Sequence, residues 1–236
     1  MVSSDTNQVK CLEICNIALS DQAELFRRRL RQWYTKYGRH FDWRDTKDPY
    51  TILLSEVLLQ RTQAPQVAMH FNDIIRLLPT LDALRGSKYD EVYRVLQPLG
   101  LAKKAGTLLA MAKCLADQFN GEIPADPNIL ESLPGVGRYI ASATACFAFG
   151  RRIPVVDTNV VRIFFRYFGI TSNRKRPHQD PLIWKLAELL LPKRKVEEYN
   201  WAIIDFAALI CTARKPVCSE CPMKRGYCSA PNLSST

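Results

Sequence analysis

Apolar residues recur along most of this 236-residue chain at the spacing of an α-helix, and the pattern breaks at proline and glycine. The periodicity predicts an all-α protein with helices at 21–37, 49–60, 64–78, 88–97, 101–119, 126–132, 138–149, 158–169, 180–191 and 196–210. One apolar run, IPVV at 153–156, has the composition of a β-strand. It is isolated and followed by a good helix start, so we expect no sheet.

The chain is strongly basic, with a formal net charge of +10 and a pI of about 9.3. Such a surface attracts polyanions, and nucleic acid is the leading candidate, although many basic proteins bind none. No apolar run approaches the ~18 residues of a membrane span, and the N-terminus lacks the pattern of an export signal. We therefore expect a cytoplasmic, nucleoid-associated monomer with no membrane partner, whose residues 1–20 form a flexible tail.

The segment LPGVGRYIA at 133–141 places two glycines between predicted helices. Gly135 and Gly137 can adopt backbone angles that other residues avoid, and they let another backbone approach closely. The helix that follows presents free N–H groups and the positive end of its dipole, which together favour an anion. On a basic chain that anion is a DNA phosphate, contacted without regard to base sequence. The alternative is an ordinary turn between helices with a glycine cap.

Asp157 follows the apolar run and opens a predicted helix. Its simplest role is to cap that helix, and Asn159 could cap it as well. An ionised carboxylate at this position could also stabilise a cation that develops during a reaction.

A second carboxylate, Glu56, lies in an apolar segment, DPYTILLSEVLLQRTQ at 48–63. A carboxylic acid in apolar surroundings is easier to protonate, so Glu56 could act as a general acid or position water. Periodicity alone favours the alternative, an exposed glutamate on a polar stripe with Ser55.

Of eight cysteines, the last four fall within a short segment with the spacing C-x6-C-x2-C-x6-C: Cys211, Cys218, Cys221 and Cys228. Without an export signal, this crowding favours metal binding over disulfides. Thiolates suit zinc or an iron–sulfur cluster, but a zinc ribbon generally has two C-x2-C pairs and this chain has one. Cys114 and Cys146 fall in apolar helical patterns and are expected in the core.

The glycine hairpin, the apolar run with Pro154 and then Asp157 resemble the HhH-GPD superfamily of DNA glycosylases. The late cysteines resemble its endonuclease III and MutY branch, and the resemblance spans roughly Phe26 to Cys228. It implies two helical lobes with DNA in a cleft. Residues 46–151 would form a helical-barrel lobe with the hairpin, and residues 21–45 plus 152–236 a second lobe with the cysteines.

The same resemblance implies roles for the carboxylates and for Tyr139. Asp157, near the junction of the lobes, would stabilise the sugar cation formed as a base departs, and Glu56, in SEVLLQ, would face the base pocket. Bifunctional relatives carry a lysine at position 139, MutY-like enzymes usually a serine, and thymine mismatch glycosylases a tyrosine in the similar string LPGVGKYTA. The resemblance therefore implies a monofunctional base excision repair glycosylase acting on thymine or uracil opposite guanine. The alternative for Tyr139 is simple packing against the hairpin.

The resemblance also implies contacts with double-stranded DNA that contains a mismatch or a damaged base. Gln60 matches a residue that fills the gap left by an extruded base, and a second wedge lies near Leu101. Arg61, Arg138 and the two hairpin glycines would lie along the same DNA surface. The alternative for Gln60 is an ordinary polar residue on the surface.

The four late cysteines resemble the ligands of the family's [4Fe-4S] cluster, which would be structural. The last loop, PMKRGY, has six residues where the usual pattern has five. Three rival functions remain at this stage: an adenine glycosylase acting opposite 8-oxoguanine, a catalytically silent iron–sulfur protein that binds DNA, and an endonuclease III-type lyase. Tyr139 argues against the first and third. The chain's end at Thr236, soon after the last cysteine, also argues against a MutY-like enzyme with a further domain.

Overall fold

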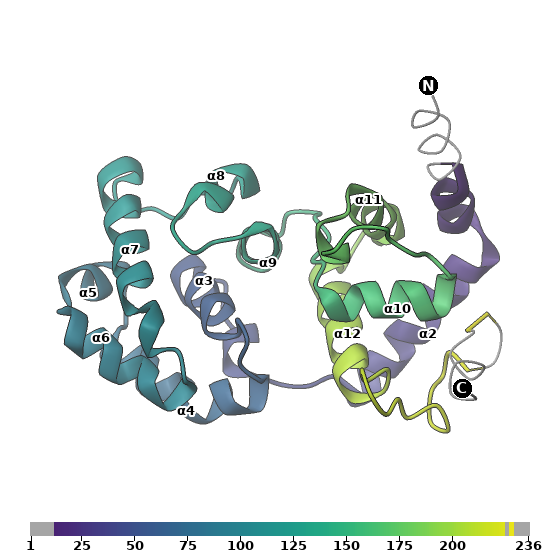
Figure 1. Ribbon diagram of the computed structural model, residues 1–236, viewed down its shortest axis with the longest axis horizontal. Coiled ribbons are helices and arrows are strands. Elements are labelled where there is room, and N and C mark those ends of the chain that lie inside the picture. The colour runs from purple at the N-terminus through teal and green to yellow at the C-terminus, as the bar shows by residue number, and fades with distance from the viewer. Residues whose placement is uncertain (1–11, 225–226, 229–236) are drawn as a thin grey trace. The chain divides into compact units, whose positions relative to one another are not determined.

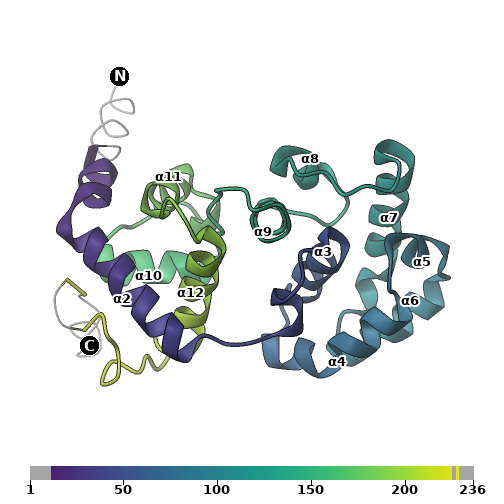
Figure 2. The same ribbon diagram turned by 180° about the vertical axis from the view of Figure 1, so that it is seen from behind.

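The computed structural model describes residues 12–224 and 227–228, and all regular secondary structure in this part of the chain is helical (Figures 1 and 2). The all-α prediction is confirmed. The run at 153–156 forms no strand. Within the described residues, no helix is long and apolar enough to cross a membrane.

The chain folds as two compact units, and each is described by itself. One contains His40–Arg151, and the other joins the segment that ends at Arg39 to the segment that begins at Arg152. The boundary lies at His40 and not at residue 46, because residues 40–45 pack into the first of these units. Trp43 stacks on Phe41 with ring centroids 4.5 Å apart and meets Phe71 edge-on at 5.1 Å.

The unit at 40–151 contains seven α-helices among its elements: α3 (Pro49–Leu58), α4 (Ala64–Leu77), α5 (Leu81–Gly86), α6 (Tyr89–Leu96), α7 (Ala105–Phe119), α8 (Pro127–Ser132) and α9 (Arg138–Phe149). Short 3-10 turns occur at Asp42–Arg44, Gln97–Leu99 and Ala102–Lys104. The last of these turns explains why α7 begins at Ala105 and not at residue 101. Asp48 caps α3 by accepting a hydrogen bond of 2.8 Å from the Thr51 N–H, as its position before proline predicts.

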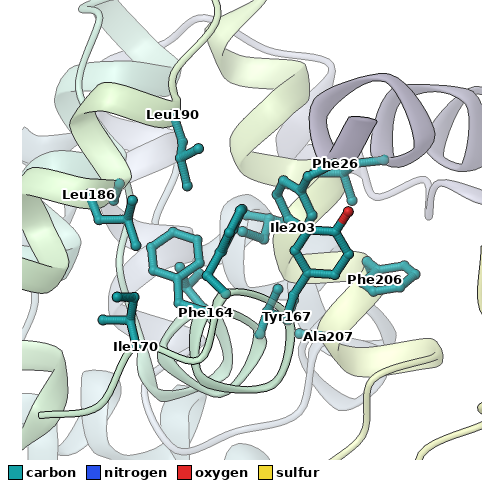
Figure 3. Packing of buried hydrophobic residues seen from close by; sticks show 14 of the residues in the cluster. Phe26, Phe164, Tyr167, Ile170, Leu186, Leu190, Ile203, Phe206 and Ala207 are labelled. Carbon is teal, nitrogen blue, oxygen red and sulfur yellow. The ribbon is translucent and has the colours of Figure 1, made fainter. Parts of the chain in front are cut away.

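The other unit contains α2 (Asp21–Tyr37), α10 (Thr158–Phe168), α11 (Pro181–Leu190) and α12 (Val196–Leu209), with a 3-10 turn at Pro177–Gln179. Their apolar faces meet in one core, in which aromatic rings pack edge-on or tilted (Figure 3). Phe26 of α2, for example, lies 5.0 Å from the ring of Tyr167 and 5.2 Å from that of Phe168.

The expectation of a flexible tail over residues 1–20 is wrong for its second half. Residues 12–19 are helical, and Ile14 and Ala18 are 2% and 7% exposed. Ile14 belongs to the core cluster of its unit, and this burial stabilises the segment. Residues 1–11 of that expected tail lie outside the described residues.

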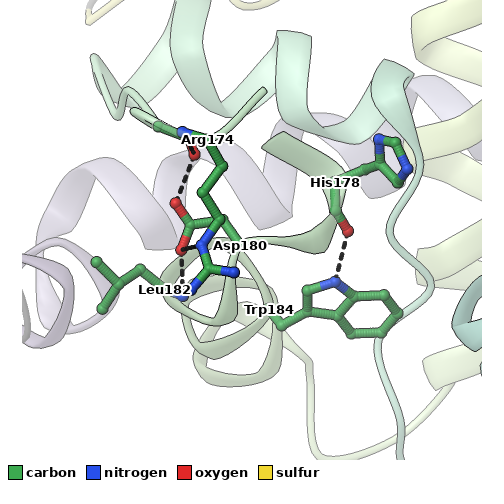
Figure 4. A network of polar contacts seen from close by, with 6 residues as sticks. Arg174, His178, Asp180, Leu182 and Trp184 are labelled. Carbon is green, nitrogen blue, oxygen red and sulfur yellow. Dashed lines mark hydrogen bonds and ion pairs between the residues drawn. The ribbon is translucent and has the colours of Figure 1, made fainter. Parts of the chain in front are cut away.

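Polar contacts fix the start of α11 (Figure 4). Asp180 caps the helix by accepting a hydrogen bond from the Leu182 N–H at 3.0 Å, and the Ser172 hydroxyl donates to the same carboxylate. The Trp184 indole N–H donates to the His178 carbonyl at 2.8 Å. These contacts anchor the loop that carries the exposed Arg174, whose guanidinium lies 4.0 Å from Asp180.

Candidate functional site

The glycine hairpin joins α8 to α9 in the manner that its sequence predicts. Gly135 has φ +77°, a left-handed conformation that favours glycine. A Cβ at Gly135 would come within 2.4 Å of the Thr107 Cγ2, so close packing against α7 also requires glycine. Gly137 is the N-cap of α9, and because it has no side chain, no side-chain hydrogen bond caps this helix. The positive end of the α9 dipole therefore lies at the hairpin.

The first two residues of α9 differ in exposure. Arg138 is exposed, whereas Tyr139 is half-buried. Partial burial lowers the pKa of Arg138, and the nearby Glu131 opposes that shift. The arginine stays positive at neutral pH, so it adds a cation beside the hairpin.

Glu56 is buried, which contradicts the exposure that periodicity alone favours. Its side chain is 4% exposed and that of Ser55 is 1% exposed. Eight of the ten residues of α3 are buried, so this helix has no solvent-facing stripe on which a glutamate could lie. Helix α3 packs against α9. The burial of Glu56 follows from the packing of α3 against its neighbours, which the spacing of residues along the helix does not report.

Gln60, Lys104 and Gly135 form a link between three segments of the 40–151 unit. The Gln60 Nε2 donates to the Gly135 carbonyl at 3.2 Å, and the Lys104 ammonium donates to the Gln60 Oε1 and, at 3.4 Å, to the Val57 carbonyl. A pocket of about 180 Å³ lies beside this link, lined in part by these residues, Thr107 and Met111. The sequence gave no sign of this link, because its members lie far apart along the chain.

Two further predicted contact residues lie nearby in sequence. Arg61 is exposed and has φ +64°, an uncommon conformation for a residue with a side chain. Leu101 is 7% exposed, so its side chain packs inside the unit in this structure. A wedge role for Leu101 would require the side chain to move when DNA binds.

Lys104 should make the stability of the protein depend on pH. Burial, and after it the charge of Arg61, lowers the pKa of Lys104 to about 8. The unfolded chain keeps the ordinary pKa of about 10.4 and binds more protons than the folded chain between these values, so the free energy of unfolding rises with pH there. We expect the wild type to gain stability relative to Lys104→Met between about pH 7 and about pH 10 in urea unfolding. A stability difference that does not change with pH would contradict the assignment.

In the other unit, Asp157 is the N-cap of α10. One carboxylate oxygen accepts hydrogen bonds of 2.9 Å from the Asn159 and Val160 N–H groups. The second oxygen accepts a hydrogen bond of 2.5 Å from the Asn159 side-chain amide. The capping role is thus confirmed for Asp157. Asn159 does not cap the helix itself, because its side-chain amide donates to the Asp157 carboxylate. The side chain is only half-buried, so its second oxygen retains room for another partner.

The extended segment before Asp157 is held by a residue that the sequence did not single out. The Asn200 side chain on α12 accepts from the Val155 N–H at 3.1 Å and donates to the Ile153 carbonyl at 3.0 Å. A side-chain amide thereby takes the place of a neighbouring strand, which explains why this apolar run forms no sheet. Asn200 is 1% exposed. A polar residue in the apolar pattern of α12 was the available signal, but its partners could not be read from the sequence.

The four late cysteines follow the end of α12 and are each half-buried. Cys211, Cys221 and Cys228 pack against the core of their unit. Burial, and after it the charges of Cys228, Cys211 and Cys218, raise the pKa of the Cys221 thiol to about 11, so Cys221 lies within electrostatic reach of the other three. Cys146 is buried as predicted, whereas Cys114 is half-buried, not a core residue. Cys11 lies outside the described residues.

The donor set, four cysteine thiols, fits an iron–sulfur cluster. Among the described residues, no group of three or more histidine, cysteine or carboxylate side chains could hold one metal ion. In an iron–sulfur cluster each thiolate binds a different iron, so the sulfurs stand farther apart than the ligands of one ion. Cys221 and the three cysteines that influence its pKa would each supply one such thiolate.

Two arginines of α10 fasten the first cysteine. The Arg162 guanidinium donates to the carbonyls of Cys211 and Ala207 at 2.8 and 3.0 Å. Arg166 donates to the Cys211 sulfur at 3.4 Å and to the Thr212 carbonyl at 2.7 Å. Helix α10, which Asp157 caps, therefore also fixes the start of the cysteine loop.

Comparisons with known proteins agree with this arrangement. Residues 54–188 match the HhH-GPD superfamily of base excision DNA repair proteins, and residues 211–228 match the iron–sulfur binding domain of endonuclease III. The second match begins and ends at the first and last of the four cysteines. The chain therefore carries an iron–sulfur binding domain, and the six-residue last loop lies within it.

Similar proteins cover nearly the whole chain. The thymine-DNA glycosylase of Aeropyrum pernix is 41% identical, over 85% of this chain and 92% of its own length. The adenine DNA glycosylase of Buchnera aphidicola subsp. Baizongia pistaciae is 33% identical over 85% of this chain, but over only 57% of its own. The solved structure of a thermostable thymine-DNA glycosylase is 32% identical, with a TM-score of 0.83 over 90% of this chain and 97% of that one. The chain belongs to the HhH-GPD superfamily of base excision DNA repair proteins.

Proposed function

We propose that this protein is a monofunctional DNA glycosylase that hydrolyses the N-glycosidic bond of thymine or uracil mispaired with guanine. Relatives named as thymine- or thymine/uracil-DNA glycosylases, 32–41% identical, support the substrate class. The observation that carries the chemistry is the Asp157 carboxylate, held in one orientation by three hydrogen bonds at the start of α10.

Asp157 is proposed to stabilise the transition state. Breaking the bond between a base and its deoxyribose leaves positive charge on the sugar ring. A carboxylate that is already oriented stabilises this charge without having to reorganise during the reaction. The cap hydrogen bonds provide that orientation. Two of them end on one carboxylate oxygen and one ends on the other, so the second oxygen is available to the sugar.

Glu56 is proposed to assist departure of the base. Thymine and uracil leave as anions unless a proton or a hydrogen-bond donor reaches them. An acid in a buried position on α3 can donate to the departing base or hold the attacking water. Because α3 packs against α9, Glu56 belongs to the same unit as the hairpin.

Tyr139 is proposed to leave the hydrolysis to water. A phenol lacks the amine that forms a covalent Schiff base with the sugar. The enzyme would therefore release the base and leave the abasic site intact.

DNA binding is proposed to involve the hairpin and its neighbours. Gly135, Gly137 and the start of α9 would bind a phosphate, with Arg138 and Arg61 adding positive charge. Gln60 and Leu101 would fill the space left when the target nucleotide leaves the stack, which offsets the unstacking cost of a few kcal/mol. We infer that one chain is sufficient for this binding.

We infer that the iron–sulfur group is a [4Fe-4S] cluster, held by Cys211, Cys218, Cys221 and Cys228. Its contribution when bound is structural, because it orders a loop that carries the basic residues Arg214 and Lys215. Iron and sulfide analysis of the purified protein should give four of each per chain. A zinc-only protein would contradict this inference.

A panel of duplexes tests the proposed function. We expect thymine and uracil to be released from pairs with guanine, little release from thymine–adenine pairs, and no covalent adduct after borohydride treatment. Release of adenine opposite 8-oxoguanine alone would identify an adenine glycosylase. A trapped adduct would identify a lyase, and binding to every duplex without release would identify a silent DNA-binding protein.

A further inference from the structure

A pocket of about 490 Å³ in the unit that carries Asp157 is lined by an unusual number of cations. Arg27, Arg28 and Arg31 come from α2, and Arg194 and Lys195 come from the turn before α12. Residues 157–160 and the four late cysteines do not line it. The pocket is therefore separate from the groups to which a role has been given above.

The cations that line this cationic pocket outnumber its carboxylates by five to two. Two carboxylates, Glu24 and Glu198, also line it, but Glu198 is paired with Lys195 at 2.8 Å. Among the described residues, the four arginines form no ion pair and no side-chain hydrogen bond. Like charges placed four residues apart on a helix, as Arg27 and Arg31 are, destabilise it. A bound anion would relieve this repulsion.

The backbone and the floor of the cationic pocket also suggest a binding site. Lys195 has φ +60°, a left-handed conformation that a residue with a side chain rarely adopts, and this turn places Arg194 and Lys195 opposite α2. Leu30, Ala202 and the rings of Tyr34 and Tyr199 give the pocket an apolar part. An apolar floor with a rim of guanidinium groups suits an anion that carries both phosphates and a planar ring.

We propose that the cationic pocket binds the phosphate groups of a nucleotide, supplied either by a nucleic acid strand or by a free nucleotide. Guanidinium groups bind phosphate oxygens in pairs of charge-assisted hydrogen bonds, and four of them converge from two elements. The inference rests on charge and shape within one unit and not on base excision activity.

The test compares the full chain with Arg27→Gln/Arg194→Gln, which removes one arginine from each wall. The matched control is Arg76→Gln/Arg85→Gln, which removes the same charge from two exposed arginines that each pair with an aspartate. Binding of ATP is measured by calorimetry, and binding of undamaged duplex DNA is measured across a series of salt concentrations. Glutamine is a good helix former, so both variants should fold.

If a free nucleotide is the ligand, the pocket variant should weaken ATP binding about ten-fold or more, while the control changes it little. If a nucleic acid strand is the ligand, the slope of log affinity against log salt should fall by about two in the pocket variant only. Equal behaviour of both variants in both measurements would overturn the proposal. Single-turnover base release with saturating enzyme should be unchanged in either variant, so loss of the pocket function and loss of glycosylase function are distinguishable.

Discussion

Asp157→Asn is expected to slow base release by about 10²–10³-fold, equivalent to about 2.7–4 kcal/mol of lost transition-state stabilisation. Asparagine keeps the size of the side chain and is itself a favourable N-cap, so α10 should remain folded. What is lost is the negative charge beside the sugar. The rate should be measured as a single turnover with saturating enzyme on a duplex with thymine opposite guanine, so that weakened binding does not enter.

The control for this prediction is Asp180→Asn. Asp180 caps α11 in the same unit and in the same way, by accepting a hydrogen bond from the N–H two residues later. The two variants therefore make the same chemical change at two helix starts. If both slow base release equally, or if Asp157→Asn releases the base at the wild-type rate, the proposed electrostatic role is wrong.

Glu56→Gln is expected to lower the same single-turnover rate by about 10²-fold or more, the usual contribution of a positioned general acid or base. Glutamine has nearly the same shape, so the buried position in α3 should stay filled and unfolding should change little. The loss comes from the missing acidic proton or carboxylate beside the base. Affinity for the mismatched duplex, measured separately, should remain close to that of the wild type.

Ser55→Ala provides a packing control for Glu56. Ser55 is 1% exposed, and its hydroxyl donates to the Ile52 carbonyl at 2.8 Å within α3. Its removal perturbs the same stretch of helix without touching the acid. A rate that falls in Ser55→Ala as far as in Glu56→Gln would show that α3 acts through its position and that Glu56 has no chemical role.

Much of the fold could be predicted from the sequence because its signals are local. Proline and aspartate mark the start of α3, and the glycine hairpin marks the junction of α8 and α9. The helix α5 (Leu81–Gly86) escapes detection, because six residues contain too few turns to show a period and it lacks the Asp-Pro start that marks the equally short α8. The helix at 12–19 also escapes detection, because its stability comes from the packing of Ile14 in the core of its unit.

The contacts that complete the candidate site could not be predicted, because they join residues far apart in the chain. Asn200 on α12 replaces a strand partner beside Val155, and Gln60 bonds to Gly135 across 75 residues of sequence. Glu56 was misjudged by periodicity for a related reason. A helix surrounded by protein shows no polar stripe, so exposure along it follows from its neighbours and not from its own spacing.

The link at Gln60 has a consequence for how the enzyme would search a genome. Without DNA, the amide of this side chain is engaged twice, with the Gly135 carbonyl and with the Lys104 ammonium. If it enters a duplex as proposed, it must give up both partners, and a mismatched base pair opens at lower cost than a sound one. Gln60 would therefore enter the duplex first at weakly paired positions. Restraint of one glutamine would thus let the protein travel past intact sequence and halt where pairing is already faulty.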